Sequence, residues 1–173
     1  MEKLLVVCDC QKDMFSRLTD LSAEKNICAL IEKMRDCADI IFTLDSHDES
    51  YFSSAESAVD KNPHCLVNTE GWQLYGDIGD NLTTADTVFI KPVYGSLELG
   101  NHIKETGYDE IMLCGLMTSG AVFANAVIAR CALTDAHVKI IGNACADSDS
   151  AAAKNALDAA AKIGVEILLT EDM

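Results

Sequence analysis

The sequence has 173 residues, of which 49% are hydrophobic, so it carries enough apolar material for one sizeable core. Its formal net charge is −15, from 28 acidic and 13 basic residues, and such a field repels nucleic-acid phosphates and anionic membrane surfaces. We therefore expect a single domain over residues 1–173 that binds neither nucleic acid nor membranes.

The first residues do not resemble an export signal, because the apolar run that begins at Leu4 ends after a few residues at Asp9. No segment approaches the roughly 18 continuous apolar residues that a membrane-spanning helix needs. The eight cysteines are scattered and form no Cys-x-x-Cys pair, which favours reduced thiols over disulfides. The sequence therefore predicts a cytoplasmic protein.

Apolar runs rich in β-branched residues alternate along the chain with segments of helical periodicity. This alternation predicts an α/β fold of three layers, with a mostly parallel, six-stranded sheet between helices on both faces. The strands are expected at 4–7, 39–44, 87–90, 111–114, 138–141 and 165–169. The helices are expected at about 22–37, 97–106, 119–133 and 150–163, with Gly107 and Gly164 after two of them.

Candidate functional residues follow the predicted strands. Ligands of open parallel sheets bind at the carboxyl edge of the strands, so four strand ends bring polar or glycine-rich segments to one rim. Residues 46–86 have little periodicity and form a long candidate functional loop. The polar residues at the rim are Asp9 after the first strand, Asp45 and His47 after the second, Lys91 after the third, and the turn from Gly115 to Ala121 after the fourth.

Asp9 and Lys91 each end a buried strand, where a charge without a partner is costly. An Asp–Lys pair keeps both side chains charged and leaves either one able to handle a proton. A structural ion pair at the strand ends fits the spacing equally well, so both interpretations stay open at this point.

Asp45 and His47 lie two residues apart on an emerging strand, so their side chains leave the same face and can share a cation. Glu56 and His64 in the following loop complete a set of two carboxylates and two imidazoles. This donor set suits Zn²⁺, iron(II) or Mn²⁺, with positions left for water or substrate. Asp-x-His alone is a weak signal, and a surface histidine is its commoner explanation.

The segment from Cys114 to Arg130 passes from a buried strand through a glycine-containing turn into a helix. Free backbone N–H groups at such a helix start attract a developing negative charge, as an oxyanion hole requires. An ordinary turn of small residues is the alternative interpretation.

Together these motifs resemble the cysteine hydrolase (isochorismatase-like) superfamily, whose nicotinamidase/pyrazinamidase branch is the nearest match. The resemblance extends through nearly the whole chain. The matching motifs, in order, are Asp9-Cys10-Gln11-Lys12-Asp13-Met14, Asp45 with His47, Glu56 with His64, Leu74-Tyr75-Gly76-Asp77, Lys91 with Tyr94, and Thr118-Ser119-Gly120-Ala121-Val122.

The resemblance implies a metal-containing amidohydrolase that acts on a small carboxamide through an Asp–Lys–Cys triad. It also implies a non-proline cis peptide between Leu116 and Met117, and, more weakly, a homo-oligomer. The resemblance assigns catalysis to Asp9 and Lys91, the nucleophile position to Ala121, and an oxyanion hole to Met117 and Ala121. It implies substrate contacts for Met14, Phe15, Trp72 and Tyr94. It also implies a divalent metal, zinc before iron or manganese, bound by Asp45, His47, Glu56 and His64.

The chain departs from this family at the nucleophile. Family amidases attack the amide carbonyl with a cysteine thiolate, whereas Ala121 stands at that position here. Met14 replaces the usual phenylalanine, and Asp60 with Lys61 replaces the aromatic residue that usually precedes the last metal histidine. We therefore expect a chain that is catalytically impaired and traps its substrate.

Two alternatives stay open from the sequence. An isochorismatase-type vinyl-ether hydrolase lacks the cysteine and uses Asp9 only as an acid, although such enzymes generally lack the metal ligands. A non-catalytic protein that binds a small molecule or a metal ion is the other alternative.

Overall fold

The computed structural model describes residues 2–172. They form a six-stranded sheet in the order β3-β2-β1-β4-β5-β6, and every neighbouring pair is parallel. The α/β class and the parallel sheet predicted from the sequence are therefore confirmed. The strands are β1 (Lys3–Cys8), β2 (Asp39–Asp45), β3 (Thr87–Lys91), β4 (Glu110–Leu116), β5 (His137–Ala146) and β6 (Glu166–Leu168).

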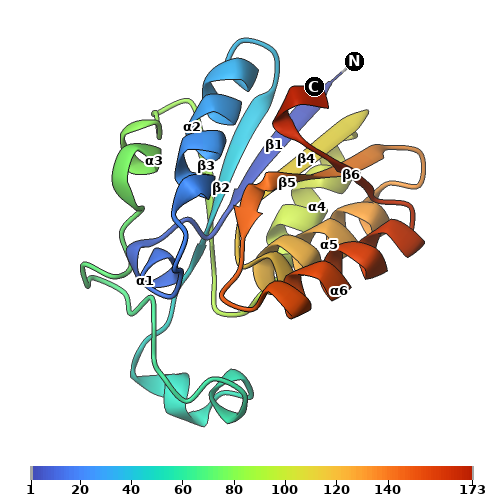
Figure 1. The fold of residues 1–173 in the computed structure, drawn as a ribbon. Coiled ribbons are helices and arrows are strands. Elements are labelled where there is room, and N and C mark those ends of the chain that lie inside the picture. Colours follow the sequence, from blue (N-terminus) through green and yellow to red (C-terminus); the bar gives the residue numbers. More distant parts are fainter. Residues whose placement is uncertain (1, 173) are drawn as a thin grey trace.

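Helices cover both faces of the sheet (Figure 1). Buried residues of α2 (Ser22–Met34) pack on one face, and those of α4 (Leu97–Thr106), α5 (Phe123–Ala132) and α6 (Ser150–Lys162) belong to the core of the other. The short helices α1 (Lys12–Phe15) and α3 (Gly76–Asp80) lie in the connections after β1 and before β3. Three layers result, as the sequence predicts.

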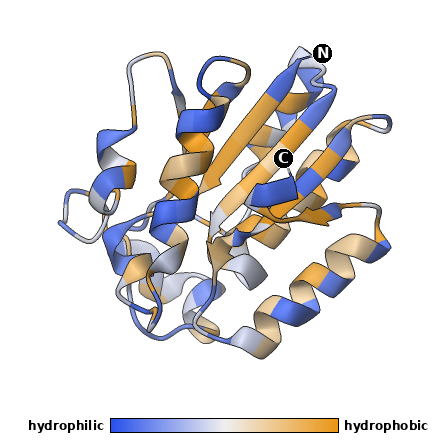
Figure 2. Ribbon diagram, turned by 45° about the horizontal axis from the view of Figure 1, so that its top comes forward, coloured by the Kyte–Doolittle hydropathy of each residue, from blue (hydrophilic) through white to orange (hydrophobic). Residues whose placement is uncertain are grey.

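Strand β1 at the centre of the sheet shows why its residues form a buried strand. Leu5 and Val7 belong to the core beneath α2, whereas Leu4 and Val6 belong to the core beneath α4 and α5. Because both faces are covered, the strand reads as a continuous apolar run rather than an alternating one. Figure 2 shows the same contrast between apolar central strands and helices with one polar face.

Helix α4 has the bounds that the sequence predicts. Ser96 caps its first turn, because its Oγ accepts a hydrogen bond from Leu99 N at 3.1 Å. Gly107 ends it in the left-handed conformation, with φ of +77°. The helix expected at 119–133 differs: it begins with a tight turn at Thr118–Val122, and regular α5 starts only at Phe123.

No helix within residues 2–172 is both long and apolar enough to cross a membrane.

Gly115 allows β1 and β4 to approach closely next to the end of β1. Its φ is +116°, and a Cβ at this position would lie 2.1 Å from the carbonyl oxygen of Cys8. Replacing Gly115 with alanine should therefore lower the free energy of unfolding by about 2–5 kcal/mol, the sum of an unfavourable backbone conformation and a backbone clash. Urea denaturation measures this loss.

The matched control is Gly107→Ala. Gly107 also has a positive φ, of +77°, but nothing lies within 4 Å of the added Cβ. Only the conformational cost of about 1–2 kcal/mol applies there. Equal losses for the two variants would contradict the close approach of β1 and β4 at Gly115.

Candidate active site

A small cavity of about 50 Å³ lies at the carboxyl ends of β1 to β4. Four segments far apart in the sequence meet there, as the rule for parallel sheets predicts. The cavity is lined by Asp9, Met14, Arg17, Asp45, Glu56, Asp60, His64, Lys91, Tyr94, Met117, Gly120 and Ala121.

Asp9 and Lys91 form a buried ion pair at this edge. Lys91 Nζ donates to Asp9 Oδ2 at 2.5 Å, and Thr43 Oγ1 donates to Asp9 Oδ1 at 2.6 Å. Asp9 is 1% exposed and Lys91 2% exposed, so the pair is shielded from water. Because β2 lies between β1 and β3, the pair spans one strand, and that strand contributes Thr43.

The pair has one member suited to proton transfer. Burial raises the pKa of Asp9 to about 6, although the charge of Lys91 and the hydrogen bonds from Lys91 and Thr43 oppose the rise. Burial also disfavours the charged form of Lys91, but the negative charges of Asp9 and Asp45 outweigh it and raise the lysine pKa. Lys91 therefore stays a cation near neutral pH, whereas Asp9 can exchange a proton there.

Asp45, His47, Glu56 and His64 form a compact cluster, with one potential ligand atom from each residue within 4.8 Å of the others. Asp45 Oδ2 lies 3.0 Å from His47 Nε2 and 3.1 Å from His64 Nε2. Glu56 Oε1 lies 3.4 Å from His64 Nε2. All four residues are buried. The structure thus brings together the four residues for which the sequence predicts a shared cation.

Two oxygens of this cluster lack a hydrogen-bond donor. Within residues 2–172, Asp45 Oδ1 and Glu56 Oε2 are the buried side-chain N or O atoms without such a partner. Burial raises the pKa of Glu56, which expresses the cost of an unmatched buried carboxylate. His64 Nδ1 lies 3.1 Å from the carbonyl oxygen of Asn62, and a proton on Nδ1 leaves Nε2 free to bind a metal. This donor set fits a divalent cation.

Gln11 and Asp13 hold the segment that carries the cluster. The side-chain amide of Gln11 clamps the backbone of Asp45, with Nε2 2.8 Å from its carbonyl oxygen and Oε1 2.8 Å from its N. Asp13 Oδ2 accepts a hydrogen bond from Cys65 N at 2.8 Å, next to His64. In the first motif, Gln11 and Asp13 thus position other residues, whereas Asp9 belongs to the buried ion pair.

Ala121 lies in the turn that leads from β4 into α5. The Leu116–Met117 peptide before this turn is cis, as the resemblance implies. Ser119 anchors the turn, because its N and Oγ both donate to Asp147 Oδ2, at 2.8 and 2.7 Å. Ala121 is 3% exposed and presents only a methyl group, so this position supplies no nucleophile.

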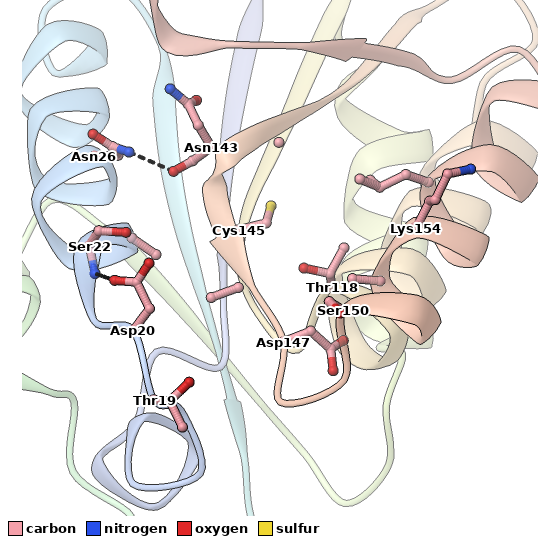
Figure 3. A pocket seen from close by; sticks show the side chains of 15 residues that line it. Thr19, Asp20, Ser22, Asn26, Thr118, Asn143, Cys145, Asp147, Ser150 and Lys154 are labelled. Carbon is pink, nitrogen blue, oxygen red and sulfur yellow. Dashed lines mark hydrogen bonds between the residues drawn. The ribbon is translucent and has the colours of Figure 1, made fainter.

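A larger groove of about 530 Å³ lies on the other side of this turn, between α2 and α6 (Figure 3). Thr118, Asp147 and Lys154 line it, together with residues of β5. It contains neither the ion pair nor the metal-ligand cluster. The smaller cavity is therefore the better candidate site, and Asp147 in the groove serves it by holding the turn.

Two of the predicted substrate contacts, Phe15 and Trp72, lie outside the cavity lining. Phe15 is 1% exposed and stacks on Tyr75 in the core, with ring centroids 4.2 Å apart. Trp72 packs against the same core and donates from Nε1 to Ser46 Oγ at 2.6 Å. Neither residue lines the cavity. Met14 and Tyr94 do line it, as do Met117 and Ala121, whose role as an oxyanion hole stays a prediction.

Arg17 and Asp60 also line the cavity, although the sequence motifs do not mark either one as a site residue. Arg17 follows Met14 by three residues, and Arg17 N donates to the carbonyl oxygen of Met14, so helical spacing places both on one side of the turn. That spacing was the available signal. For Asp60 the signal was its position four residues before His64.

Residues 3–172 match the isochorismatase domain family. Comparison with curated protein sequences gives no match. Among solved structures, the nicotinamidase of Bacillus subtilis is 22% identical with a TM-score of 0.82, covering 97% of this chain and 99% of its own. The pyrazinamidase of Pyrococcus horikoshii in complex with zinc is 24% identical, with a TM-score of 0.79 and coverage of 98% and 99%.

An isochorismatase family protein from Desulfovibrio vulgaris is 17% identical, with a TM-score of 0.81, and covers 98% of this chain and 94% of its own. At these identities the structural likeness establishes the shared fold.

The Lys91–Asp9 pair yields a stability prediction. Lys91→Met should lower the free energy of unfolding at pH 7.5 by about 3–5 kcal/mol, because it leaves a buried carboxylate without its cation. The double variant Asp9→Asn with Lys91→Met removes both charges and should recover much of the loss. Urea denaturation of the unaltered chain, of Asp9→Asn, of Lys91→Met and of the double variant checks this. A stability loss in the double variant equal to the sum of the losses in the two single variants would contradict the pairing.

Proposed function

Since the chain belongs to the isochorismatase family, we propose that it is a metal-containing carboxamide hydrolase of the nicotinamidase type in which Ala121 removes the covalent route. The chain as it stands then binds its substrate without turning it over. One observation carries this proposal: the Asp9–Lys91 pair, part of the four-residue cluster and the Ala121 turn line one cavity.

The proposed roles follow from the positions of these residues. The substrate amide lies with its carbonyl carbon next to residue 121, where a cysteine thiolate would attack in a complete site. The N–H groups of Met117 and Ala121 stabilise the oxygen that becomes negative. Asp9 carries the proton that leaves with ammonia, and Lys91 keeps Asp9 in place and limits the rise of its pKa.

Asp45, His47, Glu56 and His64 are the proposed ligands of a divalent metal, with zinc first. The two orphaned carboxylate oxygens and the buried imidazoles support this assignment. The pyrazinamidase of Pyrococcus horikoshii, which shares the fold, is described in complex with zinc. When bound, such an ion would orient a polar group of the substrate or polarise water.

One observation favours a second candidate, a vinyl-ether hydrolase of the isochorismatase type. That reaction needs an acid and no nucleophile, and Asp9, with a pKa of about 6, is suited to the role of acid beside Ala121. The cluster of Asp45, His47, Glu56 and His64 favours the amidase instead, because vinyl-ether hydrolysis by an acid does not require a metal site.

Zinc binding tests the ligand assignment. His47→Ala should weaken zinc affinity by more than about 100-fold, since removing even a group that supports a ligand costs 10–100-fold. The control is His137→Ala, because the side chain of His137 is 69% exposed and lies outside the cluster. Competition with a zinc-chelating dye measures both affinities. Unchanged affinity in His47→Ala would refute the assignment.

Restoring the nucleophile tests the reaction. With zinc bound, Ala121→Cys should release ammonia from small carboxamides at least about 1000-fold faster than the unaltered chain, because losing such a nucleophile costs on the order of a million-fold. A coupled ammonia assay with and without chelator measures this. Asp9→Asn in the restored background should abolish the gain.

Pyruvate release from isochorismate by the unaltered chain would instead establish the second candidate. If neither chain releases ammonia or pyruvate from any of these substrates, the remaining interpretation is a non-catalytic binding protein.

A further inference from the structure

Arg17 and Asp60 line the cavity but belong neither to the Asp9–Lys91 pair nor to the metal-ligand cluster. They come from different segments, Arg17 from the turn after α1 and Asp60 from the loop before His64. Arg17 Nη1 donates to Asp60 Oδ2 at 2.6 Å. Because neither residue has a task in the proposed chemistry, their position in the cavity calls for another function.

Asp60 serves as an anchor for Arg17. Its Oδ1 accepts a hydrogen bond from Asn62 N at 2.9 Å, and its carbonyl oxygen accepts one from Tyr51 Oη at 2.6 Å. Each carboxylate oxygen of Asp60 thus already accepts a hydrogen bond from a protein donor.

Arg17, in contrast, keeps donors to spare. A guanidinium has five N–H groups, and the hydrogen bond to Asp60 is the one that the side chain makes within residues 2–172. The side chain is 30% exposed, so these donors remain accessible at the cavity. Lys91, the other cation that lines the cavity, lies against Asp9 and Asp45. Arg17 is thus the cavity cation with uncommitted donors among the described residues.

The chemistry of the other lining residues narrows the ligand class. A guanidinium matches a carboxylate best, with two parallel hydrogen bonds. Tyr94 is the one phenyl-type ring among the described side chains that line the cavity, and the imidazole of His64 belongs to the proposed metal site, which gives a flat ring little to stack on. A cavity of about 50 Å³ admits only a short molecule.

The charge balance permits such a ligand. The lining residues include four carboxylates, Asp9, Asp45, Glu56 and Asp60, and two cations, Arg17 and Lys91. A divalent ion at the proposed metal site brings the sum of these charges to zero. An acidic ligand would then meet no net negative charge, whereas without the ion it would meet two excess negative charges.

We infer that Arg17, anchored by Asp60, is a specificity-determining residue that selects short carboxamides carrying a carboxylate over neutral amides. The inference rests on the proposed function, since it assigns the substrate class of the same cavity. It makes nicotinamide, which has no carboxylate, a poor ligand.

The test is calorimetric binding to the zinc-loaded, unaltered chain, which retains its ligand because Ala121 blocks turnover. The probes are matched pairs of equal length: succinamate with succinamide, and malonamate with malonamide. We expect the acidic member of the preferred pair to bind at least 10-fold tighter, and the advantage to disappear when zinc is removed. Nicotinamide should bind no better than the neutral amides.

Variants assign the preference to Arg17. Arg17→Gln should bring the affinity ratio of acid to amide close to one with zinc affinity unchanged, and Arg17→Lys should keep part of the preference. The matched control is Arg130→Gln, because Arg130 donates to the carbonyl oxygens of Leu133 and Thr134 far from the cavity lining. This control should preserve the full ratio.

Several outcomes overturn the inference: no binding of either member, equal binding of both, or a preference that survives Arg17→Gln.

Failure of the proposed function is distinguishable in the Ala121→Cys chain. Equal ammonia release from acidic and neutral amides there would refute the selectivity and leave the amidase in place. No ammonia from any amide, with the acid preference intact in binding, would refute the amidase and leave the assignment of Arg17.

Discussion

The buried contact between Lys91 and Asp9 is the interaction on which the rest of the site depends. Lys91 Nζ lies 2.5 Å from Asp9 Oδ2 and 3.7 Å from Asp45 Oδ1, so one cation connects Asp9 with the four-residue cluster. It also joins residues from β1, β2 and β3 at a single point. Moving β3 by a fraction of a residue would therefore disturb the acid, the cluster and the cavity together.

The cavity is lined by the ion pair, part of the four-residue cluster and the anchored turn, whereas residue 121 is an alanine. No cysteine among the described residues lines the cavity. Cys8 and Cys114 are fully buried, and burial raises their thiol pKa values far above the usual range, so neither offers a thiolate in place of residue 121. Gln11 still clamps Asp45, and Ser119 still anchors the turn. The hydrogen bonds that hold Asp45 and the turn are thus present around the unreactive methyl group of Ala121.

The sequence predicts the sheet well, because buried parallel strands are apolar runs and their carboxyl ends are marked by Asp9, Asp45 and Lys91. It does not settle whether Phe15 faces the cavity, because a short helix can turn an aromatic side chain toward the core or toward the cavity, and periodicity over α1 is too brief to decide. Trp72 lies outside the helices and strands, where no periodicity applies. The position of Arg17 in the cavity is not predicted from the sequence for a different reason. Its anchor lies 43 residues further along the chain, so only the folded structure shows what holds it.

Charge acts on this site at two ranges. The net charge of −15 acts over about a Debye length and repels an acidic ligand during its approach. In the proposed site, Arg17 and a divalent ion would act within the cavity, at contact distance, where screening by salt is weak. The long-range field therefore slows the entry of an acid but not that of a neutral amide. Selectivity at equilibrium depends mainly on the contacts that the ligand makes after entry. In a chain this acidic, a carboxylate can be preferred only if a cation at contact distance, such as Arg17 with its spare N–H donors, outweighs the long-range repulsion.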